Sequence, residues 1–210
     1  MANDDEIAAR GGLLPVNFPY GNFRRNLYRL STSTTADVFI GQPMGISAGS
    51  SAVVIPAPSS AAGTSKILGS VVGFVDTNKA GLPTGMTDLT QGGYLPRNTD
   101  AFCIISDDPE QLYMIQEDTG GGVLYEGNIG QTGVFVTRTT SGSTVTGYST
   151  AEFDRSSIVA TGSGSLQLVG LVDKMNSDGT ANTFGNYGKL LVRIAHPALG
   201  VLSDVNPGVP

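Results

Sequence analysis

The sequence of 210 residues has little of what several classes of protein require. It contains one cysteine, one histidine and no tryptophan. These numbers exclude an internal disulfide, a cysteine zinc cluster and a histidine-rich metal site. Charged residues are only 14% of the chain and hydrophobic residues 40%, which argues against a helical bundle and against intrinsic disorder. With 29 glycines and 11 prolines as well, the composition predicts a mostly β protein with many loops.

The charge balance and the start of the chain limit the kinds of partner that we expect. Twelve basic residues against 18 acidic ones give a net charge of −6, which is unfavourable for neutralising nucleic-acid phosphates. The opening MANDDEIAAR is acidic and lacks the apolar segment of a secretory signal. No apolar run approaches the ~18 residues that span a bilayer. We therefore expect a protein made in the cytoplasm, with neither nucleic acid nor membrane as a partner.

Residues 1–25 differ from the rest of the chain and read as an extended N-terminal arm. Two prolines and the absence of alternation disfavour a regular element, and a disordered tail is the plain alternative. Six large apolar residues favour docking on a neighbour instead, because a solvated tail rarely carries so many. The basic pair that follows favours salt bridges to an acidic protein surface. The predicted partner contacts are therefore Leu13, Leu14, Val16, Phe18, Tyr20, Phe23, Arg24 and Arg25.

From Asn26 the chain shows short β-favouring runs, and we assign residues 26–205 to one β-rich domain and 206–210 to a tail. Turn signals every 8 to 15 residues, without a convincing amphipathic helix, predict a β-barrel or β-sandwich. Residues 76–99 read as a long loop, and one helical turn is expected after Asp108. The predicted strands are 27–30, 36–40, 52–55, 67–75, 101–106, 112–117, 123–125, 134–137, 145–148, 166–173 and 189–195.

One internal echo is present. Val72-Gly73-Phe74-Val75-Asp76 resembles Val169-Gly170-Leu171-Val172-Asp173, 97 residues further on, and a polar turn follows each copy. Two copies do not make a solenoid. They are either equivalent strands of a β domain or a chance similarity between strands rich in valine and glycine.

One sequence pattern resembles the active site of a hydrolase. Gly45-Ile46-Ser47-Ala48-Gly49 matches the G-x-S-x-G nucleophile elbow, and His196 would be the base. The elbow needs a helix after the serine, whereas a strand-like run ending in Pro56 follows here. His196 ends the last predicted strand, where a structural role is favoured. We expect no catalytic residue from this pattern.

Five carboxylates bracket one short predicted strand: Asp107, Asp108, Glu110, Glu117 and Asp118. A glycosidase or a calcium site could use such a set, but turn and capping roles explain it better. The single Cys103 lies in an apolar run and is expected to be a buried, inert thiol. We therefore expect no metal and no cofactor.

The segment from Asp107 to Glu117, DDPEQLYMIQE, resembles a stretch of a family of tailed-phage virion proteins known as head-decoration or capsid-cement proteins. Further similarities follow in the same order over roughly residues 27–200. They are the entry strand 37–44, the strand 67–74 (ILGSVVGF), and the closing strands 168–173 and 191–194. The resemblance implies a β-rich body, usually trimeric, clamped on the outside of an icosahedral shell, without catalytic residues.

The expected function is therefore that of a bacteriophage cement protein, a structural component of the virion exterior. It would bind the major capsid protein and itself, as a homotrimer, and stabilise contacts between shell subunits without a small-molecule substrate. The alternative is another virion β module, such as a head fibre, tail or baseplate part, that binds a host glycan. Its aromatic candidates are Tyr94, Tyr125, Tyr148 and Tyr187.

Overall fold

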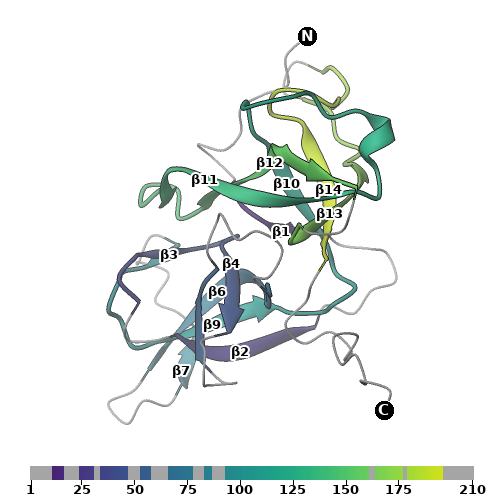
Figure 1. Cartoon of the computed structure of the whole chain (residues 1–210). Coiled ribbons are helices and arrows are strands. Elements are labelled where there is room, and N and C mark those ends of the chain that lie inside the picture. Colours follow the sequence, from purple (N-terminus) through teal and green to yellow (C-terminus); the bar gives the residue numbers. More distant parts are fainter. Residues whose placement is uncertain are drawn as a thin grey trace, which may run out of the picture.

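The computed structural model describes residues 11–16, 24–30, 34–46, 53–57, 66–77, 83–86, 93–160, 164–176 and 179–195. The predicted mostly β fold is confirmed: strands dominate, and they form a closed five-strand barrel together with a second ring-like sheet. None of the described residues belongs to a helix long and apolar enough to cross a membrane. The single domain over 26–205 stays a prediction, and its described part consists of two packed rings of strands (Figure 1).

The first ring uses the N-terminal half of the chain. Its strands are β2 (Arg25–Leu30), β4 (Pro43–Ile46), β5 (Val53–Pro56), β6 (Gly69–Thr77) and β9 (Phe102–Ser106). Pairing runs β4-β5-β2-β9-β6 and returns from β6 to β4, which closes the circuit. β7 (Pro83–Met86) extends the sheet beyond β6, and β3 (Val38–Phe39) pairs with β8 (Tyr94–Leu95) alongside.

The second ring uses the C-terminal half. Its strands are β10 (Leu112–Glu117), β11 (Thr132–Gly142), β12 (Ser149–Val159), β13 (Leu166–Leu171) and β14 (Lys189–Ile194). Pairing runs β10-β12-β11-β13-β14 and closes from β14 to β10. A 3₁₀ turn, η1 (Glu126–Asn128), lies between β10 and β11, and β1 (Leu14–Pro15) pairs with β10.

The two rings have the same topology. In each, the first strand along the chain pairs parallel with the third and antiparallel with the fifth. The second strand pairs antiparallel with the third and the fourth, and the fourth with the fifth. A parallel pair within an otherwise antiparallel ring, at the same place in both halves, identifies the chain as two copies of one strand plan.

The register agrees as well. The pairing of β6 with β9 skips one residue between Val71 and Gly73, and that of β13 with β14 skips one between Leu168 and Gly170. Each skip is a β-bulge, which bends a strand and increases its twist. The echo seen in the sequence lies on these bulges. The interpretation of the two segments as equivalent strands is therefore confirmed, although the strands belong to two rings.

A second echo becomes visible only in the structure. Ile40-Gly41-Gln42 and Ile129-Gly130-Gln131 enter the second strand of each ring. Gly41 N–H donates to Val71 O at 2.8 Å, and Gly130 N–H donates to Leu168 O at 2.8 Å. Both glycines have a positive φ, 77° and 90°, which a residue with a Cβ adopts only at a cost. The same turn therefore anchors β4 to β6 and β11 to β13.

Each ring has its own core. One buried cluster includes Val54, Cys103 and Ile105, and the other has Phe153, Leu190 and Val192 at the corresponding ring positions. Burying an aliphatic or aromatic side chain of this kind contributes about 1.5–3 kcal/mol. The sequences of the two rings differ widely because any well-packed apolar set satisfies the same strand plan.

The rings meet at a seam made of backbone contacts. Ile40 N–H donates to Gly147 O at 3.0 Å, and Ser149 N–H donates to Ile40 O at 2.8 Å. The hairpin end of β11 and β12 thus lies against the first ring, above β3 in Figure 1. Gly12 also approaches Gly41 so closely that a Cβ on Gly12 would lie 2.5 Å from Gly41 O. The seam is therefore a specific, tightly fitted contact.

Several local predictions were wrong. Residues 123–125 lead into η1 and form no strand, and residues 145–148 belong to the turn between β11 and β12. The predicted loop 76–99 contains β7 and β8, and the expected helical turn after Asp108 is a hydrogen-bonded turn. In each case turn-forming residues within a short apolar run, or short apolar runs within a polar loop, obscured the strand pattern.

Candidate docking surface

β2 presents an apolar residue between two arginines on the outside of the first ring. Alternation along the strand leaves Arg25, Leu27 and Arg29 exposed and turns Leu30 into the core. Leu27 is 43% exposed and lies between two charged side chains of the same strand. Ile104, the Cα partner of Leu27 on β9, is half-buried. We call Arg25, Leu27, Arg29 and Ile104 the β2 face.

Gly73 on β6 leaves room for Ile104 beside it on this face. The Cδ1 atom of Ile104 lies 3.4 Å from where a Cβ of Gly73 would be, so the isoleucine rests on the bulge of β6. Leu27 and Ile104 therefore form a continuous apolar strip over two strands. In Figure 1, β2 borders the first ring on the side away from the second ring.

Acidic groups hold two arginines at the borders of this face. Arg29 Nε and Nη2 donate to the two carboxylate oxygens of Asp100 at 3.1 and 2.9 Å, and this bidentate contact raises the pKa of Arg29. Arg24 Nε lies 3.3 Å from Asp107 Oδ1 as an ion pair. Exposed pairs contribute little to stability. They do orient long side chains, so Arg24 and Arg29 are held in defined positions.

Asp107 is the buried hub beneath β2. Its Oδ2 accepts hydrogen bonds from Tyr28 Oη at 2.5 Å and from Asn26 Nδ2 at 2.8 Å. Because Asn26 and Tyr28 alternate with the exposed residues of β2, the network fixes the strand from its inner side. The first aspartate of the DDP motif thus positions the face, and Asp108 accepts a turn bond from Glu110 N–H at 3.0 Å. The turn role predicted for Asp108 is confirmed.

The Tyr28 hydroxyl makes the fold sensitive to alkali. Burial, together with the hydrogen bond to Asp107, raises the pKa of Tyr28 from 10.0 to about 12. Its contribution to stability is therefore complete below pH 10.0 and is lost as the pH rises through about 12. In urea unfolding, Tyr28→Phe should lose less stability than the wild type over this window. Equal losses in the two proteins would contradict this.

The N-terminal residues predicted to contact a partner have neighbours within the chain. Leu13 is fully buried in the core of the second ring, and its N–H donates to Gly41 O at 2.7 Å. Leu14 and Val16 are half-buried where β1 pairs with β10. A partner could reach Leu13 only if this segment left the core, whereas Leu14 and Val16 are partly exposed, and contact of all three with a partner stays a prediction. Phe18, Tyr20 and Phe23 lie outside the described residues.

The residues considered for catalysis have structural partners where they are described. Glu117 is buried against Arg155, with Nη1 and Oε1 3.4 Å apart. Its Oε2 accepts from Gly185 N–H at 3.0 Å. Cys103 is buried as predicted, and burial raises the pKa of its thiol to about 12. Gly45 and Ile46 lie in β4, which pairs antiparallel with β5, while Ser47 and His196 lie outside the described residues.

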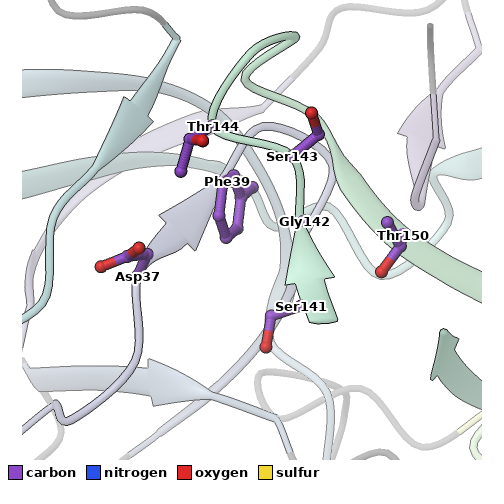
Figure 2. A pocket seen from close by; sticks show the side chains of 7 residues that line it. All are labelled: Asp37, Phe39, Ser141, Gly142, Ser143, Thr144 and Thr150. Carbon is purple, nitrogen blue, oxygen red and sulfur yellow. The ribbon is translucent and has the colours of Figure 1, made fainter. Parts of the chain in front are cut away.

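A depression of ≈ 430 Å³ opens beside the seam. Asp37 and Phe39 line it from the first ring, and Ser141, Thr144 and Thr150 from the β11–β12 hairpin (Figure 2). The ring of Phe39 stacks on Tyr94 with centroids 5.6 Å apart and is almost fully buried. An aromatic platform for a sugar needs an exposed ring face, so this depression does not favour the glycan-binding alternative.

The four tyrosines considered for glycan binding do not share one environment. Tyr94 stacks within the first ring's side sheet, and Tyr148 is bridged to Ile40 at the seam. Tyr125 belongs to the exposed loop before η1, and Tyr187 lies in the turn before β14 with a φ of 63°. Tyr94 and Tyr148 both follow glycines that meet at the seam, since a Cβ on Gly93 would lie 3.2 Å from Gly147 Cα, whereas Tyr125 and Tyr187 belong to separate loops of the second ring.

The comparisons with known proteins assign the chain to no family. A scan of the chain against protein-family models found no match, and a search of curated proteins found none either. Among the described residues, no three metal-ligating side chains come together as a metal site.

Proposed function

We propose that this chain is a non-enzymatic decoration, or cement, protein of a bacteriophage head. It binds the major capsid protein on the outer surface of the icosahedral shell and stabilises the contacts between neighbouring subunits. Its place is the virion exterior after synthesis in the host cytoplasm. The resemblance of the segment 107–117 and of the strands around it to cement proteins is the starting point.

The observation that carries the proposal is the β2 face. An exposed Leu27 between Arg25 and Arg29 suits a protein surface with an apolar recess and acidic borders. Arginine is among the residues that contribute most binding energy at such interfaces, and the buried centre of an interface is more apolar than its rim. This face includes Arg25, which the sequence predicts as a partner contact, and the neighbouring Arg24 is another predicted contact. The docking ligand is therefore a protein.

Cement function requires only binding. A ligand that binds the assembled shell and not its separated subunits stabilises the assembled state by mass action. Many copies bind one shell, and each spans a joint between subunits, so their individually weak contributions to the stability of the shell add up. The homotrimer that the resemblance implies would place three β2 faces on one local symmetry axis of the shell.

The test is binding to DNA-free shells of the phage that encodes the chain. Leu27→Asp should weaken binding roughly 10- to 100-fold, because the contact loses the ~1.5–3 kcal/mol of a buried leucine. Met175→Asp is the matched control, since Met175 is an exposed apolar residue of the second ring. It should bind as the wild type does.

Two outcomes separate the surface from the function. If the wild type binds shells and Leu27→Asp binds equally well, the function stands and the β2 face is wrong. If the wild type binds no shells and is absent from purified particles, the cement function itself is wrong. Binding to intact host cells instead would support the glycan-binding alternative.

A further inference from the structure

A row of three polar side chains crosses the second ring. Gln116 on β10 is the Cα partner of Lys189 on β14 and of Glu152 on β12. The three strands are neighbours in the sheet, with β10 between the other two (Figure 1). Residues paired across neighbouring strands have their side chains on the same face of a sheet. The amine, the carboxamide and the carboxylate therefore share one face, with Gln116 in the middle of the row.

All three side chains are buried, although they do not belong to the apolar core of the ring. Ile115 precedes Gln116 and is part of that core, so Gln116 is directed to the opposite face of the sheet. Only 5% of Gln116 and 3% of Glu152 and of Lys189 is exposed. Removing such groups from water is costly, above all for the charged ones. The fold thus keeps three reactive groups away from solvent.

Lys189 is held at its backbone and at its side-chain nitrogen. Its N–H donates to Asn182 Oδ1 at 2.8 Å, and its O accepts from Asn182 Nδ2 at 2.8 Å. Its Nζ donates to Gln116 Oε1 and to Tyr187 O, each at 3.1 Å. Tyr187 has a φ of 63°, which is uncommon for a residue other than glycine. Because Oε1 is bonded to Cδ, these contacts hold Nζ close to the carboxamide carbon of Gln116.

We propose that Lys189 and Gln116 join in an isopeptide bond that the folded chain forms by itself, with Glu152 transferring the protons. The carboxylate of Glu152 accepts a proton from the ammonium group of Lys189, which frees the electron pair of Nζ. Nζ then attacks Cδ of Gln116, so that the Nζ–Cδ bond forms and the Cδ–Nε2 bond breaks. Nε2 leaves as ammonium with the two protons lost from Nζ. Glu152 ends as a carboxylate, and nothing is oxidised or reduced.

Three physical effects favour this reaction in the folded chain. Fixing the amine beside the carboxamide makes the attack unimolecular and removes most of its entropic cost. Burial disfavours the charged forms of an amine and a carboxylate, and so favours the proton transfer that precedes the attack. The product replaces a buried ammonium by a neutral amide. The bond would also join β10 to β14, which are far apart in sequence, and would lower the entropy of the unfolded chain.

Intact-mass spectrometry of the full-length chain, denatured after folding, tests the bond and does not depend on shell binding. The wild type should be lighter by one ammonia than its sequence requires. A protease digest should contain one branched peptide that includes residues 116 and 189. Lys189→Arg and Gln116→Ala should each keep the full mass. Lys174→Arg is the matched control, because Lys174 is a half-buried lysine between β13 and β14, and it should still lose one ammonia.

Glu152→Gln tests the proton transfer separately. It should lose ammonia roughly 100-fold more slowly than the wild type, and Glu152→Asp, which keeps a carboxylate, should recover part of the rate. Thermal unfolding verifies that both variants are folded, and the wild-type mass decides on the bond itself even where they are not. A wild type of full sequence mass would overturn the proposal, as would a Lys189→Arg protein that still loses ammonia. A Glu152→Gln protein that reacts at the wild-type rate would overturn the part assigned to Glu152.

Discussion

Replacing Arg155 with leucine is expected to destabilise the protein by about 3–5 kcal/mol at neutral pH. The guanidinium is 7% exposed and faces the fully buried carboxylate of Glu117. It also donates to Gly120 O, Thr119 O and Asn186 Oδ1, so it holds the chain after β10 against β12. Without it, Glu117 keeps the bond from Gly185 N–H but loses its counter-charge in the interior.

The loss should depend on pH in a defined direction. Burial raises the pKa of Glu117 above 4.5, while the bonds from Gly185 and Arg155 oppose the rise. Removing Arg155 raises this pKa further, because one opposing contact disappears. The extra cost of the ionised carboxylate is absent below pH 4.5 and grows as the pH rises through the folded-state pKa. Arg155→Leu should therefore be least harmful in mild acid.

Denaturant unfolding at acidic and neutral pH measures both effects. Arg193→Leu is the matched control: it removes an exposed strand arginine bonded to Gln167, and it should cost under about 1 kcal/mol at either pH. Combining Arg155→Leu with Glu117→Gln should recover part of the loss at neutral pH. An Arg155→Leu protein as stable as the control, or equally destabilised at both pH values, would contradict this account of the pair.

The strand content could be predicted from the sequence because it depends on local pattern. The runs 27–30, 102–106, 112–117 and 189–194 are apolar, rich in β-favouring residues and bounded by turn signals, and each is a strand. β12 was missed because Ser149–Val159 carries polar residues, among them Arg155 and Glu152, that the fold buries. Their burial depends on partners distant in sequence, which no local pattern reveals.

Only part of the duplication can be recognised in the sequence. The echo on β6 and β13 is apparent in the sequence, whereas the repeat of Ile-Gly-Gln at 40–42 and 129–131 becomes meaningful only once both segments are seen to enter equivalent strands. Spacing hid the relation, because the two echoes are 97 and 89 residues apart and the loops between equivalent strands differ in length. The strand registers reveal the duplication, because a bulge and a positive-φ glycine recur at matching positions in the two rings.

The candidate site, like the fold, could be predicted only in part from the sequence. The sequence predicts Arg24 and Arg25 as partner contacts, but it does not predict that Leu27 and Arg29 are exposed on the same side of β2 as Arg25. An alternating strand predicts two faces without saying which one is inside. Burial of Leu30 in the core sets the inner side of β2, and Asp107 supports the same orientation by accepting hydrogen bonds from Asn26 and Tyr28. The position of the proposed docking surface therefore depends on partners distant in sequence.

Asp107→Ala should consequently destabilise the protein by about 2–4 kcal/mol, because it leaves the Tyr28 hydroxyl and the Asn26 amide partly buried without their acceptor. The pKa of Tyr28 should fall toward its ordinary 10.0, although burial keeps it above that value. Asp108→Ala is the control within the same motif. It removes one exposed turn bond, to Glu110 N–H, and should cost about 0.5–1 kcal/mol.

Urea unfolding of both variants, with tyrosine absorbance followed across alkaline pH, measures the two effects together. If Asp107→Ala and Asp108→Ala lose the same stability, the hub role of Asp107 is wrong. Under conditions where the Asp107→Ala protein remains folded, it should also bind shells less well than Asp108→Ala, because β2 is no longer fixed from its inner side. Unchanged shell binding would show that the β2 face does not depend on Asp107. Pairing of β2 with β9 would then be enough to position Arg25, Leu27 and Arg29.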